Sequence, residues 1–318
     1  MKRMVIALLM LNAVVFVSYL SLGYQNDLLL KVLTGNADKI ERSIVIDTRL
    51  PRFLTAVLVG ASLSASGCAM QALFRNPLAE PYILGVASGA SVGAAIATVL
   101  GFGTIQNKLI LAFVSALLTS YLVYEIGTTS RFRDQTYAIL LAGIAIASFF
   151  SGLTSLIIYF FAQSMHKVVF WIMGSFSNPQ WSEVYFALPI TIAGIAYLLI
   201  NSWNLNALLL GDEHAMAVGV DVNRFRKYLI AVIAVLTSSA VAVSGVIGFV
   251  GIIIPHTMRM LVGEEHQKLL PLTILFAMLF MPLIDLVAKT ATTGELPVGA
   301  ITAMLGGPFF VYILWRKV

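Results

Sequence analysis

Long apolar runs alternate with short polar segments along the chain. Ten runs are candidates for membrane-spanning helices, because a helix needs about 20 mostly apolar residues to cross a bilayer. They cover residues 4–23, 53–74, 82–102, 109–127, 137–162, 184–203, 228–250, 254–263, 270–290 and 297–315. Backbone groups in lipid must be hydrogen-bonded internally, so the pattern predicts an all-α polytopic membrane protein with about ten transmembrane helices. We expect residues 1–318 to form a single transmembrane domain, in which 254–263 is a short, interrupted segment.

Basic residues near the ends of short loops predict the orientation of these spans, because such loops stay in the cytoplasm. With both termini inside, eleven basic residues lie on the cytoplasmic side and eight lie outside. Five of those eight fall in the long segment 24–52, where the rule is weak. The first run follows Lys2 and Arg3 and resembles a signal peptide, but its length of about 20 residues predicts an uncleaved span.

The composition agrees with a membrane protein and argues against other classes. The chain is 59% hydrophobic and only 11% charged, whereas soluble domains carry about 25% charged residues. A net charge of +5 reflects basic cytoplasmic loops rather than nucleic-acid binding. Cys68 is the only cysteine, so no intrachain disulfide is possible, and it is expected to pack as a small apolar residue.

Two segments share a spacing that is typical of an internal repeat. In "SASGCAMQALFRNP" a Ser-Gly pair at 66–67 precedes Pro77, and in "AVSGVIGFVGIIIP" a Ser-Gly pair at 244–245 precedes Pro255 at the same interval. The expected topology runs the first segment inward and the second outward. An inverted repeat is therefore possible, although Ser-Gly pairs are common in such helices.

The stretch "LLLGDEHAMAVGVDVNRFRK" at 208–227 is charged although candidate spans flank it. Asp212 is a candidate N-cap with Glu213 in the first turn, and Gly219 is a candidate C-terminal glycine. Asp221 would then cap a second short helix. Gly211, Ala215 and Gly219 recur every four residues, which places them on one helix face open to close contact. That face packs either against the protein's own spans or against a partner.

The sequence contains no P-loop and no HExxH motif, and its four histidines lack metal-ligand spacing. Polar residues inside spans are costly and often functional. His256 and Arg259 either line a polar path or form an internal pair. Asp285 and Lys289 are four residues apart, so a pair on one helix is expected.

Two loops carry further candidates. Arg49 and Arg52 in "TRLPR" precede a span and are either interfacial anchors or a positive docking patch for an acidic partner. The short inner loop 127–136 is either a solvated basic loop or a gate.

Four segments together resemble the FecCD-type permeases, the membrane subunits of type II ABC importers for iron chelates, haem, cobalamin and related cargo. The resemblance covers residue 49 to the C-terminus. The segments are "RLPRFLTAVLVGASLSASGCAMQALFRNPLAEPYILGVASGA" (49–90), "FWIMGSFSNPQW" (170–181), "GFVGIIIPHTMRMLVG" (248–263) and "ELPVGAITAMLGGPFFVYIL" (295–314).

The resemblance implies a permease in the inner membrane that performs no bond chemistry, binds no cofactor and moves cargo inward by alternating access. It implies a homodimer or close heterodimer around a central path. Two cytoplasmic ATP-binding subunits would hold ATP and Mg²⁺, and an extracytoplasmic binding protein would deliver the cargo. The cargo stays open among siderophore-iron, haem, cobalamin and an oxyanion such as molybdate.

The resemblance also assigns roles to residues. The element at 207–227 would dock on the ATPase, and "WIMGSFSNPQW" (171–181) would follow the fifth span as a short outer helix beside the path. Arg49, Arg52 and Lys289 would contact the binding protein. Gln135 and Thr136 would form the gate; His256 and Arg259 are the path candidates from their polarity within a span. The ATPase-coupling residues would be Gly211, Asp212, Glu213, Ala215, Ala217, Gly219 and Asp221.

Two other functions compete with this interpretation. An ion- or proton-coupled secondary transporter requires a membrane-buried carboxylate pair or relay, and Asp285 is the only acid well inside a predicted span, with Glu125 near the end of one. A polytopic receptor or scaffold is disfavoured by ten spans and no sizeable soluble domain.

Overall fold

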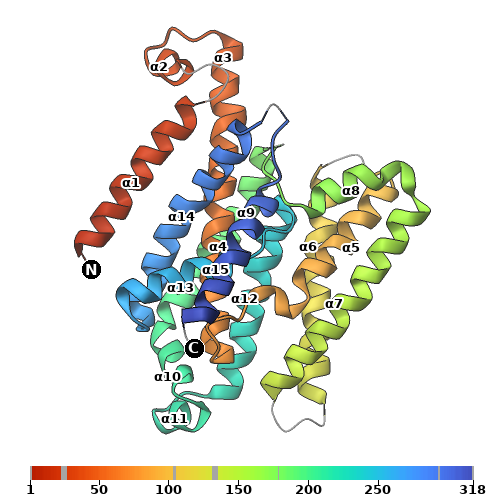
Figure 1. Cartoon of the computed structure of the whole chain (residues 1–318), viewed down its shortest axis with the longest axis vertical. Helices are drawn as coiled ribbons and strands as arrows, with labels where there is room; N and C mark the ends of the chain where they lie inside the picture. The colour runs from red at the N-terminus through yellow and green to blue at the C-terminus, as the bar shows by residue number, and fades with distance from the viewer. Residues whose placement is uncertain are drawn as a thin grey trace.

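The computed structural model describes residues 2–22, 27–102, 105–130, 135–177, 179–292 and 294–316, and these residues fold into helices without strands (Figure 1). The α-helices are α1 (Lys2–Ser21), α2 (Leu28–Leu33), α3 (Lys39–Ser43), α4 (Leu50–Phe74), α5 (Val86–Val99), α6 (Ile105–Thr129), α7 (Gln135–Phe160), α8 (Met165–Ile172), α9 (Trp181–Ile200), α10 (Ser202–Leu209), α11 (Asp212–Ala217), α12 (Val222–Ser244), α13 (Val250–Val262), α14 (His266–Thr290) and α15 (Val298–Arg316). The π-helical segment η1 (Ile44–Arg49) joins α3 to α4, and the 3-10 turns η2 (Pro81–Leu84) and η3 (Ala162–Ser164) precede α5 and α8.

Each of the ten predicted spans corresponds to one helix: α1, α4, α5, α6, α7, α9, α12, α13, α14 and α15. Within the described residues, seven helical stretches are long and apolar enough to cross a membrane, and α5, α13 and the apolar part of α15 are shorter. The prediction of an all-α polytopic membrane protein is confirmed.

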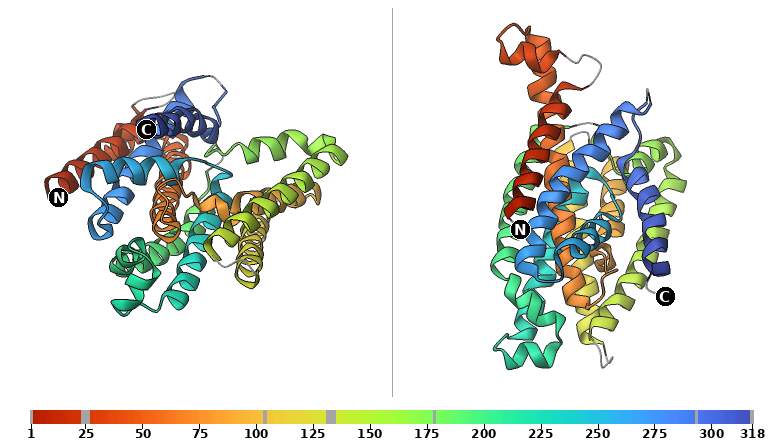
Figure 2. Two further views of the ribbon diagram at one scale, coloured as in Figure 1. Left: turned by 60° about the horizontal axis from the view of Figure 1, so that its bottom comes forward. Right: turned by 60° about the vertical axis from the view of Figure 1, so that its left-hand side comes forward.

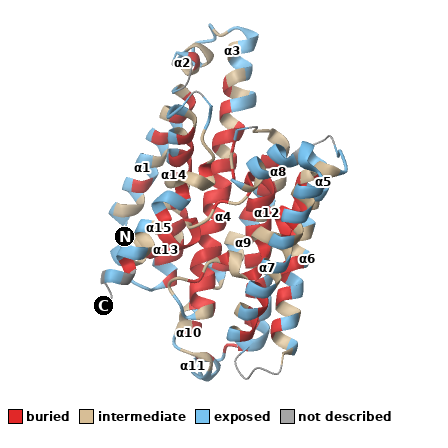
Figure 3. Ribbon diagram, turned by 45° about the vertical axis from the view of Figure 1, so that its right-hand side comes forward, coloured by how far each residue is buried: buried red, intermediate tan, exposed pale blue. Residues whose placement is uncertain are grey.

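Helix α4 is the axis of the bundle. It continues α3 and η1 in one helical stretch, Lys39–Phe74, whose most apolar window is 94% buried, whereas the corresponding window of α7 is 17% buried. In Figure 3 α4 is almost entirely red, and it packs against α9, α12, α13 and α14. The other two views place α1 along the outside of the bundle, against α14 (Figure 2). The mostly uncovered apolar faces of α1 and α7 are those expected of helices in lipid.

Small residues allow α4 to lie this deep. A Cβ atom added to Gly67 would lie 2.1 Å from the Gly251 carbonyl oxygen of α13, and one added to Gly60 would lie 2.8 Å from the Ala277 carbonyl oxygen of α14. Backbones approach this closely only where side chains are absent, as is usual between membrane helices. The two segments that share the Ser-Gly spacing therefore touch each other. One is a continuous helix, the other is broken after Ser244, and their relation as an inverted repeat stays a prediction.

The close contact gives a first prediction. Gly67→Ala should destabilise the protein by about 1–3 kcal/mol, because the new methyl group meets backbone that cannot rotate away. The measurement is the thermal unfolding temperature of the purified protein in detergent. Gly152→Ala in α7 is the matched control, since a Cβ atom there meets nothing within 4 Å. Equal unfolding temperatures for the two variants would contradict the prediction.

Candidate functional site

The charged element at 208–227 lies at one end of the bundle, opposite to α2 and α3 (Figure 1). Two glycines with positive φ bound its short helix α11: Gly211 at +112° before it and Gly219 at +88° after it. The Asp212 carboxylate accepts hydrogen bonds from Arg226 of α12 at 2.8 Å and from Arg75, just after α4, at 3.2 Å. One carboxylate therefore ties α11 to two long helices.

Two details differ from the sequence prediction. The N-cap of α11 is Gly211, and Asp212 is the first residue of the helix. Residues 222–227 form the first turns of α12 rather than a separate short helix, because nothing interrupts the helix between the cap and the span. Two other predictions are confirmed: the Asp221 side chain accepts a hydrogen bond from the Arg224 N–H at 3.1 Å, and Gly219 directly follows the C-cap residue of α11.

The small residues do not form one open face. Ala215 is completely buried within the chain, whereas Ala217 and Gly219 are exposed. The predicted shared helix face is wrong, because only Ala215 lies within α11, whereas Gly211 and Gly219 flank it with positive φ. Ala215 is covered by the protein itself. An apolar surface lies next to it instead, which we call the α11 patch: Leu210, Met216, Ala217 and Val218, of which Leu210 is 69% and Met216 56% exposed.

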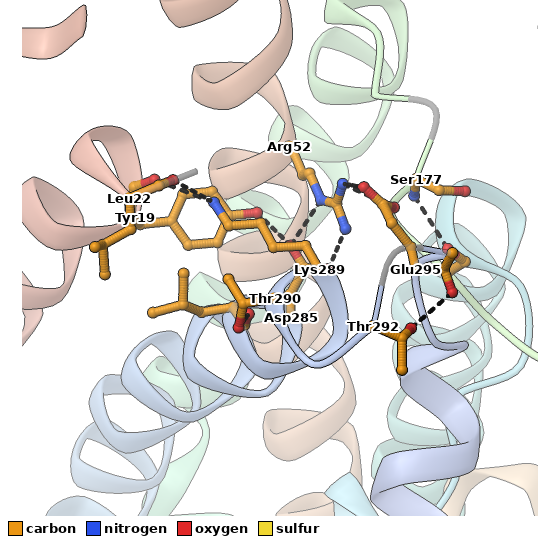
Figure 4. A network of polar contacts seen from close by, with 12 residues as sticks. Tyr19, Leu22, Arg52, Ser177, Asp285, Lys289, Thr290, Thr292 and Glu295 are labelled. Atoms are coloured by element: carbon orange, nitrogen blue, oxygen red, sulfur yellow. Dashed lines mark hydrogen bonds and ion pairs between the residues drawn. The ribbon is translucent and has the colours of Figure 1, made fainter. Parts of the chain in front are cut away.

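At the opposite end the two predicted docking arginines are buried. The Arg52 guanidinium forms two 2.8 Å hydrogen bonds to the Asp285 carboxylate, and its Nη1 lies 2.8 Å from a Glu295 carboxylate oxygen (Figure 4). The Tyr19 hydroxyl also donates to Asp285. Arg49 Nη1 donates to the Leu20 carbonyl at 2.6 Å. Both arginines are less than a tenth exposed, so in this conformation Arg49 ties η1 to α1 and Arg52 ties α4 to α14. Their contact with a binding protein stays a prediction.

Lys289 belongs to the same network (Figure 4). Its ammonium lies 3.9 Å from the centre of the Tyr19 ring and donates to the carbonyls of Tyr19 and Leu22 at 3.2 and 3.3 Å. The expected pair of Asp285 with Lys289 is wrong, because the bidentate Arg52 guanidinium occupies the carboxylate. A planar guanidinium fits two carboxylate oxygens, which a single ammonium cannot do.

The network gives a second prediction. Asp285→Asn should destabilise the protein by about 3–5 kcal/mol, because it removes one charge of a buried pair and leaves Arg52 under-compensated. Glu295→Gln is the control, and it should cost about 1 kcal/mol or less, since the Glu295 side chain is 38% exposed. Both are measured as thermal unfolding in detergent. A larger effect for Glu295→Gln would refute this ranking.

The centre of the bundle contains a break in the helix. Between α12 and α13 residues 245–249 are not helical, and Phe249 has a φ of +67°, which is strained for a residue with a side chain. The Glu80 carboxylate accepts a hydrogen bond from the Phe249 N–H at 2.8 Å. The Tyr82 hydroxyl donates to the Ile247 carbonyl at 2.9 Å and accepts from its N–H at 3.2 Å. The loop after α4 thus satisfies the broken backbone.

Sequence reasoning missed Glu80 and Tyr82. The only available signal was an acid inside "NPLAEPY", a proline-rich segment between two apolar runs. Such a residue needs a polar partner when it lies between membrane helices. The partner itself is 169 positions away and cannot be read from a local pattern.

The Gln71 side chain of α4 forms hydrogen bonds near both ends of α13. Its amide nitrogen donates to the Gly251 carbonyl at 3.1 Å, and its amide oxygen accepts from Arg259 at 2.7 Å. His256 packs edge-on against the Phe309 ring of α15. His256 and Arg259 line a cavity of about 660 Å³ near the α11 end; its other polar lining residues are Gln71, Arg75, Asn76, Glu264 and Tyr312. The expectation that both residues face a water-filled space fits this geometry.

A second cavity, of about 390 Å³, lies toward the other end of the bundle. Its lining includes Thr55, Lys108, Phe170, Trp171, Phe176, Glu183 and Glu295. The short helix expected at 171–181 is wrong for most of that segment: the short helix α8 ends at Ile172, and Ser175, Phe176, Ser177 and Pro179 border the cavity without helical structure. Gln135 and Thr136 form the first turn of α7, and residues 131–134 of the predicted gate loop lie outside the described residues.

The structure holds no cluster of three metal-ligating side chains among the residues it describes.

The break gives a third prediction. Glu80→Ala should destabilise the protein by about 1–3 kcal/mol, because the Phe249 N–H loses its acceptor inside the bundle. Glu80→Gln is the matched control, since an amide oxygen can still accept this hydrogen bond. Thermal unfolding in detergent measures both. If Glu80→Gln is as damaging as Glu80→Ala, the charge rather than the hydrogen bond is what matters.

The arrangement defines a class: a multi-pass helical membrane protein with a broken helix at its centre and cavities on either side. The sequence model of the FecCD transport family matches residues 4–316, and the chain belongs to this family. It is similar to the cobalamin import system permease protein BtuC of Halobacterium salinarum, with 41% identity over 271 residues that cover 85% of this chain and 73% of that protein. It is also similar to the molybdate import system permease protein MolB of Haemophilus influenzae, with 37% identity over 290 residues that cover 88% and 83%.

A solved structure has the same fold. An inward-facing metal-chelate type ABC transporter matches 99% of this chain and 100% of that one, with a TM-score of 0.89 and 34% sequence identity. The family, the helical fold and the function as an ABC importer permease, all predicted from the sequence, are confirmed.

Proposed function

We propose that this chain is the membrane subunit of an ATP-driven importer that moves a metal chelate, haem or cobalamin-type cargo into the cytoplasm by alternating access. The match to an inward-facing metal-chelate transporter over 99% of the chain carries this proposal. The larger of the two cavities described above lies at the α11 end, which fits a path open toward the cytoplasm. The cell membrane, with both termini in the cytoplasm, is the corresponding location.

The α11 patch is the proposed contact for a cytoplasmic ATP-binding subunit, and ATP and Mg²⁺ would be held there rather than by this chain. Exposed Leu210 and Met216 lie at the end of the bundle, outside the long apolar helices, and a protein partner would remove them from water. Exposed Glu213, Ala217 and Gly219 would lie in the same contact, whereas Ala215 supports it from beneath. Asp212 would pass movement of α11 to α12 and α4 through its two arginine partners.

The α2–α3 end is the proposed contact for an extracytoplasmic binding protein. Because Arg49 and Arg52 are buried, the basic residues available to an acidic partner there are the exposed Lys39 and Arg42 of α3. Lys31 is already held by Glu41 at 2.6 Å and Asp27 at 3.0 Å, and these carboxylates raise its pKa to about 12. A second permease copy would complete the path, which is typical of this type of transporter.

An ion-coupled secondary transporter finds no support in the geometry. Asp285 is completely buried but is held by the Arg52 guanidinium and the Tyr19 hydroxyl. Both of its carboxylate oxygens are occupied by donors of the protein itself, so neither is left open to a transported ion.

The function is tested by reconstituting the chain with its ATPase and binding protein in liposomes. We expect uptake that requires ATP and ATPase activity that rises when the cargo-loaded binding protein is added. Uptake that proceeds without ATP or without the ATPase chain would overturn the proposal. Candidate cargoes, including a siderophore complex, haem and cobalamin, are first ranked by their affinity for the binding protein.

The α11 patch gives a fourth prediction. Met216→Asp should weaken association with the ATPase subunit by about tenfold or more, because it places a charge in the centre of an apolar contact. Co-purification and ATPase stimulation measure the effect. Lys268→Gln, an exposed position paired with Glu265, is the control and should behave as wild type. Normal co-purification of the Met216→Asp protein would show that the ATPase subunit binds a different surface.

A further inference from the structure

A groove of about 320 Å³ lies between α6 and α12, separate from the two cavities described above. Leu117, Ser120, Tyr121, Tyr124 and Glu125 line it from α6. From α12 it is lined by Lys227, Ile230, Ala231, Ala234 and Val235. The spacing of three and four residues on both helices shows that two facing helix stripes form its walls.

The groove is polar at one end and apolar at the other. Glu125 and Lys227 lie near the ends of their helices that face the α11 side of the molecule, whereas Leu117 and Val235 lie about two turns further into the bundle. Small side chains at Ala231 and Ala234 keep the apolar part open. A narrow apolar slot with charged groups at its mouth matches the shape and polarity of a membrane lipid.

The charges at the mouth are of opposite sign, yet Lys227 and Glu125 form no ion pair within the part of the chain that the structure describes. The Tyr121 hydroxyl interacts with the Glu125 carboxylate. Arg224, one turn nearer to α11, lies over the Tyr228 ring and does not line the groove. The mouth therefore offers the Lys227 ammonium, the Glu125 carboxylate and the Tyr121 hydroxyl.

We propose that this groove binds one phospholipid whose headgroup carries both a phosphate and a primary amine, as in phosphatidylethanolamine. Lys227 would contact the phosphate, Glu125 would accept hydrogen bonds from the ammonium, and one acyl chain would lie between α6 and α12. A phosphatidylcholine headgroup has no N–H to donate to Glu125, and phosphatidylglycerol brings no cation to it. With α11 in the cytoplasm, as proposed above, this lipid would belong to the inner leaflet. The binding itself does not depend on that orientation.

The experiment is native mass spectrometry of the full chain, delipidated in detergent and supplied with phosphatidylethanolamine, phosphatidylglycerol or phosphatidylcholine of identical acyl chains. The wild type should retain one phosphatidylethanolamine about fivefold more strongly than either other lipid. Glycerophosphoethanolamine, which has the headgroup but no acyl chains, should not be retained. Retention of the chain-free compound would show a site for a soluble phosphate ester and overturn the lipid proposal.

Three variants separate the parts of the site. Lys227→Gln should weaken retention of phosphatidylethanolamine and phosphatidylglycerol alike, and Glu125→Gln should remove the preference between them. Ala231→Leu should abolish retention by filling the slot without changing a charge. Lys268→Gln and Ala196→Leu, at exposed positions outside the groove, are the matched controls and should retain lipid as wild type does.

Size-exclusion profiles and thermal unfolding confirm that each variant is folded before its bound lipid is measured by mass spectrometry. Equal retention of all three lipids by the wild type, or no loss in Ala231→Leu, would overturn the proposal. A stronger signal for phosphatidylglycerol would overturn the headgroup assignment. The measurement needs no cargo, ATP or partner chain, so its failure is independent of a failure of transport.

Discussion

The break between α12 and α13 depends on side chains from a distant part of the chain. Backbone groups freed inside a membrane protein have no water to bind, so a break persists only where the protein supplies partners. Here Glu80 and Tyr82 supply them for Phe249 and Ile247. The loop after α4 and the loop before α13 therefore stabilise each other, and neither conformation would be stable alone. His256 and Arg259, which line the cavity at the α11 end, lie on α13 directly after this break.

Helix α4 links this centre to both ends of the molecule. At its N-terminal end Arg52 ties it to Asp285 of α14, and at its C-terminal end Arg75 reaches Asp212 of α11. Between them, Gln71 holds both ends of α13. The buried pair tolerates no loss of one partner, whereas the exposed Arg75–Asp212 pair contributes little to stability. The Arg52–Asp285 pair is therefore suited to hold the fold, and the Arg75–Asp212 pair is suited to form and break.

The sequence predicted the elements better than their contacts. Ten apolar runs became ten helices because length and hydropathy are local quantities, and the Asp221 cap and the Gly219 helix end follow from local backbone chemistry as well. The burial of Arg49 and Arg52 could not be predicted, because charge near a span does not reveal the carbonyls or the carboxylate of another helix that will hold it. The burial of Ala215 could not be predicted either, since a spacing of four does not reveal whether the chain itself or a partner covers a residue.

The placement of charge indicates how motion at one end can reach the other. Asp212 bonds to α12 and to the end of α4, so a displacement of α11 acts on two of the most buried helices at once. Packed helices with glycine contacts such as Gly67 to Gly251 cannot deform smoothly, because no side chain is present to rearrange. They can tilt as a body or slide by small steps. The segment at 245–249 has no helical ladder to preserve, and its strained Phe249 is held by one carboxylate hydrogen bond. When α11 is displaced, the backbone is therefore expected to change conformation at residues 245–249, next to the smaller cavity that Ser244 lines.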